Sequence, residues 1–138
     1  MFRSKSSVYA LLAVLEIAKR HAGGDKSGVQ AGQIAQQYKL PAAYAAKVMS
    51  QLARAKVLKS ERGPRGGFRL QRAPGQISLL QVIDAVNGLE DGFRDSIASG
   101  ASRNVRRGLA DVFKSATHDV RKSLDSVSVG DFLRKWSR

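Results

Sequence analysis

The sequence predicts a mainly α-helical protein with one small β-hairpin wing, arranged as a winged helix-turn-helix that is followed by a long C-terminal dimerisation helix. Two observations lead to this prediction. Two short helical patterns joined by a tight turn run directly into a glycine-rich, basic hairpin at residues 59–70, which is the order of elements in a winged helix-turn-helix. Further on, an apolar stripe with helical spacing extends over residues 105–127. We therefore expect a DNA-binding domain at 1–88, a polar loop at 89–103, and a dimerisation helix with a terminal helix at 104–138.

Composition narrows the classes of function. The 24 Lys and Arg residues outnumber the 11 Asp and Glu residues and give a net charge of +13, which favours a polyanionic partner, with nucleic acid first and a membrane surface second. The chain has no cysteine, so disulfides and thiolate metal sites are excluded. His21 and His118 lie far apart, and we expect no metal, no cofactor and no enzymatic activity. Because no apolar run could span a membrane and no signal peptide is evident, we expect a cytoplasmic protein.

The first three helices are predicted from apolar spacing and from their ends. The first is expected to begin at Ser6 or Ser7, where a side-chain oxygen can accept a hydrogen bond from an unpaired backbone amide. Its apolar stripe consists of Val8, Leu11, Leu12 and Leu15. A second helix follows at residues 30–38, and the residue before Pro41 avoids the α conformation, which breaks the chain before a third helix that extends to about Ala55. These last two helices alone could be a generic helical hairpin.

The segment at 59–70 reads as a hairpin with a basic tip. Pro64 fixes φ at the first central position of a turn, and Gly66 and Gly67 tolerate positive φ. Arginines at such a tip suit a narrow minor groove, which attracts guanidinium groups. An ordinary surface hairpin with a solvated basic face would show the same composition. The preceding pair of helices favours the DNA-contacting wing.

The remaining helices are predicted from local spacing. Ser78 and Gln81 have capping-box spacing and open a fourth helix, and Ser128 and Asp131 stand at the same spacing before a terminal helix. The long helix should begin near Asn104. Its apolar face is too long to be buried in so small a domain, so we expect a two-fold dimer, with packing on the chain's own first helix as the alternative. The predicted interface residues are Val105, Leu109, Val112, Phe113, Ala116, Val120 and Leu124, and the stripe continues to Val127.

Five segments resemble the Rrf-two-type winged helix-turn-helix transcriptional regulators, the family of the iron–sulfur cluster regulator IscR and the nitric-oxide sensor NsrR. They are residues 8–11 (VYAL), 33–35 (QIA), 42–44 (AAY), 58–70 (LKSERGPRGGFRL) and 77–86 (ISLLQVIDAV). The resemblance is close up to about residue 88 and implies a homodimeric, non-enzymatic regulator. Cluster-binding members carry three cysteines in the region of the polar loop. This chain resembles a cysteine-free member, so the cluster chemistry does not transfer to it.

The expected DNA-binding residues lie in the third helix, in the wing and at the N-terminus. In a winged helix-turn-helix, the first turns of the second helix of the pair enter the major groove. The resemblance matches Tyr44 to a tyrosine suited to a phosphate contact, and it places alanine where other members carry serine and glutamate near the bases. Alanine cannot donate or accept a hydrogen bond, so Lys47 is the long polar side chain of these turns. Affinity should therefore come mainly from phosphates and DNA shape. The full set is Ser4, Lys5, Ala43, Tyr44, Ala46, Lys47, Arg62, Arg65 and Gly66.

The expected function is a sequence-specific transcriptional repressor that binds double-stranded DNA as a homodimer on a palindromic operator. Two alternatives stay open. One is a non-specific, nucleoid-type nucleic-acid-binding protein, which the alanine-rich third helix favours. The other is a regulator controlled by an effector, either a small molecule or a partner protein that docks at residues 89–103.

Overall fold

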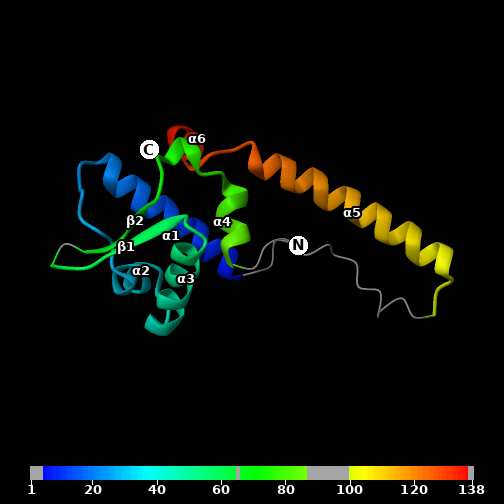
Figure 1. Ribbon diagram of the computed structural model, residues 1–138, viewed down its shortest axis with the longest axis horizontal. Coiled ribbons are helices and arrows are strands. Elements are labelled where there is room, and N and C mark those ends of the chain that lie inside the picture. The colour runs from blue at the N-terminus through cyan, green and yellow to red at the C-terminus, as the bar shows by residue number, and fades with distance from the viewer. Residues whose placement is uncertain (1–4, 65, 87–99, 137–138) are drawn as a thin grey trace.

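The computed structural model describes residues 5–64, 66–86 and 100–136. The elements follow in the order α1 (Lys5–Ala22), α2 (Ala31–Tyr38), α3 (Ala42–Arg54), β1 (Leu58–Glu61), β2 (Gly67–Leu70), the 3-10 turn η1 (Pro74–Gln76), α4 (Leu79–Val86), α5 (Arg103–Asp125) and α6 (Val129–Trp136). All except α5 gather in one body, which we call the head, and α5 projects from it on the side opposite the wing (Figure 1). The predicted mainly helical fold with a β-hairpin wing is confirmed.

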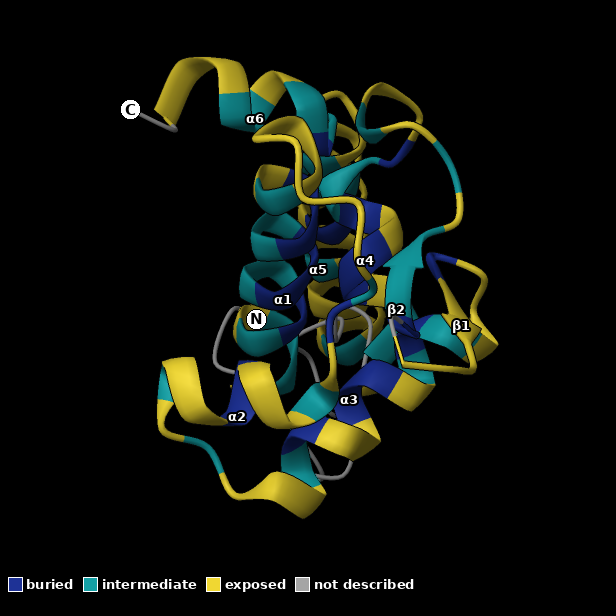
Figure 2. Cartoon of the chain, turned by 90° about the vertical axis from the view of Figure 1, so that its left-hand side faces the viewer, coloured by how far each residue is buried: buried dark blue, intermediate teal, exposed yellow. Residues whose placement is uncertain are grey.

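Helix α1 lies at the centre of the head. Its small and branched residues are buried along one face, and they are Ala10, Ala13, Val14, Ile17 and Ala18. Alanine at the contact positions lets neighbouring elements approach closely, and α3, α4, α6 and β2 all pack on this helix. Figure 2 shows buried residues along α1 and on the elements packed around it. The placement of the other elements of the head therefore depends on α1.

The helix starts confirm two of the predicted caps. The backbone amide of Ser78 donates to Gln81 Oε1 at 2.9 Å, and the amide of Gln81 donates to Ser78 Oγ at 3.1 Å, which is a complete capping box before α4. The same exchange links Ser128 and Asp131 before α6, with distances of 3.2 and 2.9 Å. Hydrogen bonding of its carboxylate by the backbone and then the side chain of Ser128 lowers the pKa of Asp131.

The predicted cap of α1 is wrong. The helix already includes Lys5, so Ser6 and Ser7 lie within its first turn and not before it. The Ser6 hydroxyl instead lies 3.1 Å from the hydroxyl of Tyr44 on α3. A contact with a residue 38 positions away could not be read from local spacing.

The wing is tied to the helix pair by an isolated β-bridge between Val29 and Phe68. The amide of Val29, in the loop between α1 and α2, donates to the Phe68 carbonyl at 3.0 Å, and the amide of Phe68 donates to the Val29 carbonyl at 2.8 Å. The two backbones meet where side chains would not fit. Gly67 has φ +126°, and a Cβ there would lie 2.8 Å from the Val29 carbonyl oxygen.

Helix α5 joins the head near its C-terminal end. Arg121 donates from Nη1 to Asp84 Oδ1 at 2.9 Å and from Nη2 to Asp84 Oδ2 at 2.8 Å. This bidentate pair links α5 to α4, and it raises the pKa of Arg121. Val127 lies beyond the end of α5, and its carbonyl accepts from the Leu79 amide at 2.9 Å. The predicted continuation of the helical stripe to Val127 is therefore wrong, because the chain turns back to the head there.

Gly67→Ala should lower the free energy of unfolding by about 2–3 kcal/mol, because alanine is strained at this positive φ and its Cβ would collide with backbone. Urea denaturation measures the change. Gly32→Ala is the matched control, since a Cβ at this helical position meets no atom within 4 Å. It should raise stability by about 0.5–1 kcal/mol. Equal effects of the two substitutions would contradict the packing described for the wing.

Candidate nucleic-acid interface

Helix α3 has one buried face and one exposed face. Ala45, Val48, Met49 and Leu52 are buried in the head. The opposite face is exposed in Figure 2 and carries Ala42, Ala43, Ala46, Lys47 and Ser50. The turn before α3 is held by Lys39, whose φ of 56° and ψ of 49° are left-handed, and by the Leu40 amide, which donates to the Ala35 carbonyl at 2.8 Å. The predicted residues Ala43, Ala46 and Lys47 thus lie together on one accessible surface.

Tyr44 lies at the edge of this surface and connects it to α1. Its hydroxyl lies 3.1 Å from Ser6 Oγ, and its ring packs edge-on against Tyr9 with centroids 5.9 Å apart. The predicted phosphate contact of Tyr44 would therefore involve a hydroxyl that α1 already positions. Lys5, one residue before Ser6, is exposed. Ser4 lies outside the described residues, and its predicted DNA contact stays a prediction.

The wing turn is closed by backbone contacts. The Gly66 amide donates to the Gly63 carbonyl at 2.9 Å, and Gly63 has φ +109°. Arg62 is exposed at the start of the turn, while Arg65 lies outside the described residues. Gly66 is buried, and a Cβ there would lie 2.3 Å from the Glu61 carbonyl oxygen. Gly66 thus allows a close backbone approach within the wing, and a contact of this residue with DNA stays a prediction.

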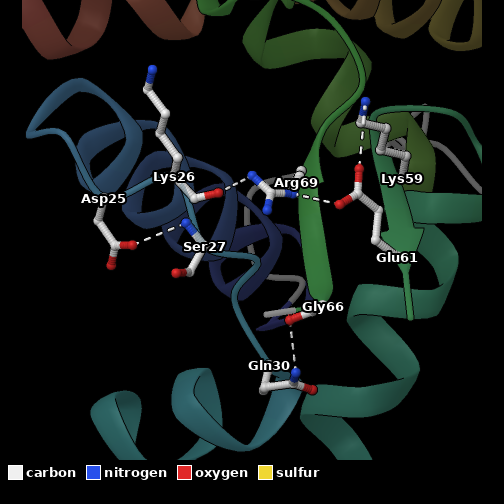
Figure 3. Close-up of polar contacts among 8 residues, drawn as sticks. All are labelled: Asp25, Lys26, Ser27, Gln30, Lys59, Glu61, Gly66 and Arg69. Carbon is white, nitrogen blue, oxygen red and sulfur yellow. Dashed lines mark hydrogen bonds and ion pairs between the residues drawn. The ribbon is translucent and has the colours of Figure 1, made fainter. Parts of the chain in front are cut away.

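Side chains that the sequence analysis did not single out hold the wing in place. Gln30 donates from Nε2 to the Gly66 carbonyl at 2.8 Å. Arg69 donates from Nε to Glu61 Oε2 at 2.7 Å and from Nη1 to the carbonyl of Lys26 (Figure 3). Nothing in local spacing indicates the contacts of Gln30 with Gly66 and of Arg69 with Lys26, because they join residues that are 36 and 43 positions apart. Ser50, by contrast, follows Lys47 by three positions, and helical spacing alone could have placed it on the exposed face.

The exposed charges on α3 and on the turn before it are positive. Lys39, Lys47, Arg54 and Arg62 are exposed on α3, on the turn before it and on the wing. At the end of α2, burial and then the charge of Glu16 raise the pKa of the Tyr38 hydroxyl. Among the described residues, no cluster of three or more His, Asp or Glu side chains could hold a metal ion, and no described helix is long and apolar enough to cross a membrane.

An exposed helix that follows a short partner helix and precedes a wing defines a winged helix-turn-helix protein, a class that binds DNA. The chain belongs to the Rrf2 family, described as iron-dependent transcriptional regulators, whose sequence profile matches residues 3–135. Proteins of this family are DNA-binding transcriptional regulators, not enzymes, and this chain shares that role. The resemblance noted in the sequence is therefore confirmed.

Individual relatives agree with this assignment. The chain is 33% identical over 130 residues to the HTH-type transcriptional regulator BadM of Rhodopseudomonas palustris, covering 94% of this chain and 80% of the relative. It is 26% identical over 125 residues to IscR of Aliivibrio salmonicida, covering 91% and 73%. The fold is shared with CymR, the global cysteine regulator of B. subtilis (TM-score 0.72, 24% identity, 98% of both chains). It is also shared with IscR of T. potens (TM-score 0.72, 23% identity, 98% and 88%).

The iron chemistry in the family description does not fit the residues of this chain. An iron–sulfur cluster is held by cysteine thiolates in most proteins that bind one, and the sequence has no cysteine. The described residues also offer no alternative cluster of ligands, as noted above. We therefore derive no regulatory step that passes through iron.

Lys47→Ala should weaken DNA binding by a similar factor at all sites and reduce the salt slope by about one unit, as expected for the loss of one phosphate contact. Fluorescence anisotropy with several duplexes and salt concentrations measures both. Lys19→Ala removes the same charge from an exposed position on α1 and should change neither quantity by a comparable amount. A loss of about 1–3 kcal/mol at a single base position would instead assign Lys47 to a base edge.

Proposed function

We propose that the protein is a homodimeric, sequence-specific transcriptional repressor that acts on a palindromic operator in the cytoplasm. In this proposal, residues 1–88 bind DNA and α5 joins the two copies. The observation that carries the proposal is the exposed apolar face of α5, on a helix that projects from the side of the head opposite the wing (Figure 1). A second copy packed along α5 would leave both α3 helices free for DNA.

The exposure of α5 varies along its length in a way that supports a partner at its N-terminal half. Val105, Leu109 and Val112 are 53%, 40% and 65% exposed. Phe113, Val120 and Leu124 are half-buried, and Ala116 is exposed. The alternative, packing of the stripe on α1, would require these residues to be covered by the head. Only Thr117 is buried among the residues of α5, all of which the structure describes. Large apolar side chains exposed in a row are typical of an interface.

Replacing Leu109 and Phe113 with glutamate should give a monomer, because two charges in an apolar interface cost several kcal/mol. Light scattering at micromolar concentration measures the mass. The control carries Ser115→Glu and His118→Glu, which add two charges at exposed positions on another face of α5, and it should stay a dimer. A Leu109→Glu, Phe113→Glu variant that is still dimeric would show that α5 is not the interface.

A nucleoid-type role is the second candidate, and the alanines on the exposed face of α3 favour it. Ala42, Ala43 and Ala46 offer no hydrogen bond to a base edge, and the charge of +13 supplies affinity for any duplex. Specificity in a repressor of this composition would come from DNA shape, from Lys47 and from the wing.

Selection of bound duplexes from a random pool separates the two candidates. The repressor should enrich a palindromic motif with two half-sites, and placing that motif over a promoter should lower transcription in a purified system when the protein is added. Recovery of duplexes without any enriched motif would support the nucleoid-type role. An increase in transcription would keep sequence-specific binding and overturn repression.

A further inference from the structure

A cavity lies behind the wing, away from the exposed face of α3. It has a volume of about 370 Å³ and is bounded by the end of α1, the loop between α1 and α2, the two strands and the start of η1. This volume lies within the range of small-molecule sites. Its lining combines two kinds of side chain. Ile17, Leu70 and Pro74 form an apolar part, and Lys59, Arg69 and Arg72 contribute positive charge.

The positive charge of the lining is only partly compensated. Lys59 and Arg69 stand directly opposite each other across the strands, an arrangement that is destabilising for like charges. Both share the carboxylate of Glu61, with Arg69 Nε 2.7 Å from Oε2 and Lys59 Nζ 3.8 Å from Oε1 (Figure 3). Arg72 donates from Nη1 to the Lys56 carbonyl at 3.0 Å and from Nη2 to Gln81 Oε1 at 3.5 Å, and no carboxylate pairs with it among the described residues.

Counting the charged side chains of the lining gives the sign of the site. Three cations face two carboxylates, Glu61 and Asp25, which leaves one positive charge. Asp25 is occupied locally, since its Oδ1 accepts from the Ser27 amide at 3.0 Å. The cavity is therefore complementary to a molecule with one negative charge and a short apolar part.

We propose that this cavity binds a small organic carboxylate whose carboxylate group meets Lys59 and Arg72 and whose apolar part lies against Leu70 and Pro74. Guanidinium groups bind carboxylates through paired, charge-assisted hydrogen bonds. The apolar lining excludes water from the remainder of the ligand and selects for a hydrocarbon chain over a bare anion.

Occupation of the cavity bears on the wing through Glu61, whose carboxylate Lys59 shares with Arg69. Arg69 joins β2 to Glu61 on β1 and to the Lys26 carbonyl in the loop before α2. A bound carboxylate that meets Lys59 competes with Glu61 for this cation and adds a negative charge beside the strands of the wing, and charges interact over about 10 Å at moderate salt. DNA binding should therefore weaken when the cavity is filled, a step that rests on the proposed function.

The binding test uses the full chain and straight-chain carboxylates from acetate to octanoate, followed by amide chemical shifts in NMR. Hexanoate should bind saturably, at least tenfold more tightly than acetate, and shift the amides of Leu70 and Arg72. Arg72→Gln should weaken hexanoate at least tenfold. Lys122→Gln, which removes the same charge from an exposed position on α5, should leave it unchanged. Ala73→Phe, at an exposed position of the lining, should block binding without disturbing the core.

Hexanol and inorganic phosphate are the probes that could overturn the site. If either binds as tightly as hexanoate, or if Arg72→Gln and Lys122→Gln have equal effects, the proposed recognition is wrong. In a second arm, saturating hexanoate should weaken binding of wild type to a duplex at least threefold and leave Arg72→Gln unaffected. Binding in the cavity without a change in DNA affinity would overturn the link to the wing but not the site. Absence of sequence-specific DNA binding would overturn the proposed function alone.

Discussion

The two backbone hydrogen bonds between Val29 and Phe68 determine how the wing stands relative to the helix pair. They attach the two-stranded hairpin, which is marginal in isolation, through an isolated β-bridge to the loop that leads directly into α2. The loop that carries Val29 leads into α2, and α2 packs on α3. The same few contacts therefore fix the position of the wing relative to α2 and α3. The glycines at 28, 66 and 67 belong to this constraint, since any Cβ there would meet backbone within 3 Å.

The head and α5 differ in how much apolar surface they expose to water. The head buries its apolar residues on α1 and leaves a mostly polar surface, while α5 carries large apolar side chains on a helix that the head covers only in part. A soluble monomer rarely exposes such a stripe.

The exposed cations of the proposed DNA-binding surface lie on other elements than this apolar stripe. They occur on the turn before α3, on α3 and at the wing. The surface that carries these cations is thus separated from the apolar surface of α5.

The sequence predicted those features that depend on neighbours along the chain. The capping boxes at Ser78 and Ser128 were confirmed because both partners lie within four residues. The exposed face of α3 was predicted for the same reason, since helical spacing places Ala43, Ala46 and Lys47 together. The prediction that failed, and the contacts that were not predicted, depend on segments that are distant in the sequence. The Ser6 hydroxyl meets Tyr44, and Arg69 reaches the carbonyl of Lys26. The cavity behind the wing is bounded by five segments of the chain and has no local signature.

The ion pair between Asp84 and Arg121 lies near one end of α5, so a small rotation there moves the other end of the helix through a larger distance. Arg103 lies 18 positions before Arg121 on this helix, which corresponds to about 27 Å at 1.5 Å per residue. A rotation of about 10° at the ion pair would carry Arg103 through about 5 Å, and successive base pairs are about 3.4 Å apart. In the proposed dimer, a change in this one exposed contact would alter the angle between α5 and the head, and with it the distance between the two α3 helices. The spacing of the operator half-sites would then depend on an ion pair outside the proposed DNA-binding residues. Substitutions at this pair would change the spacing that related proteins recognise.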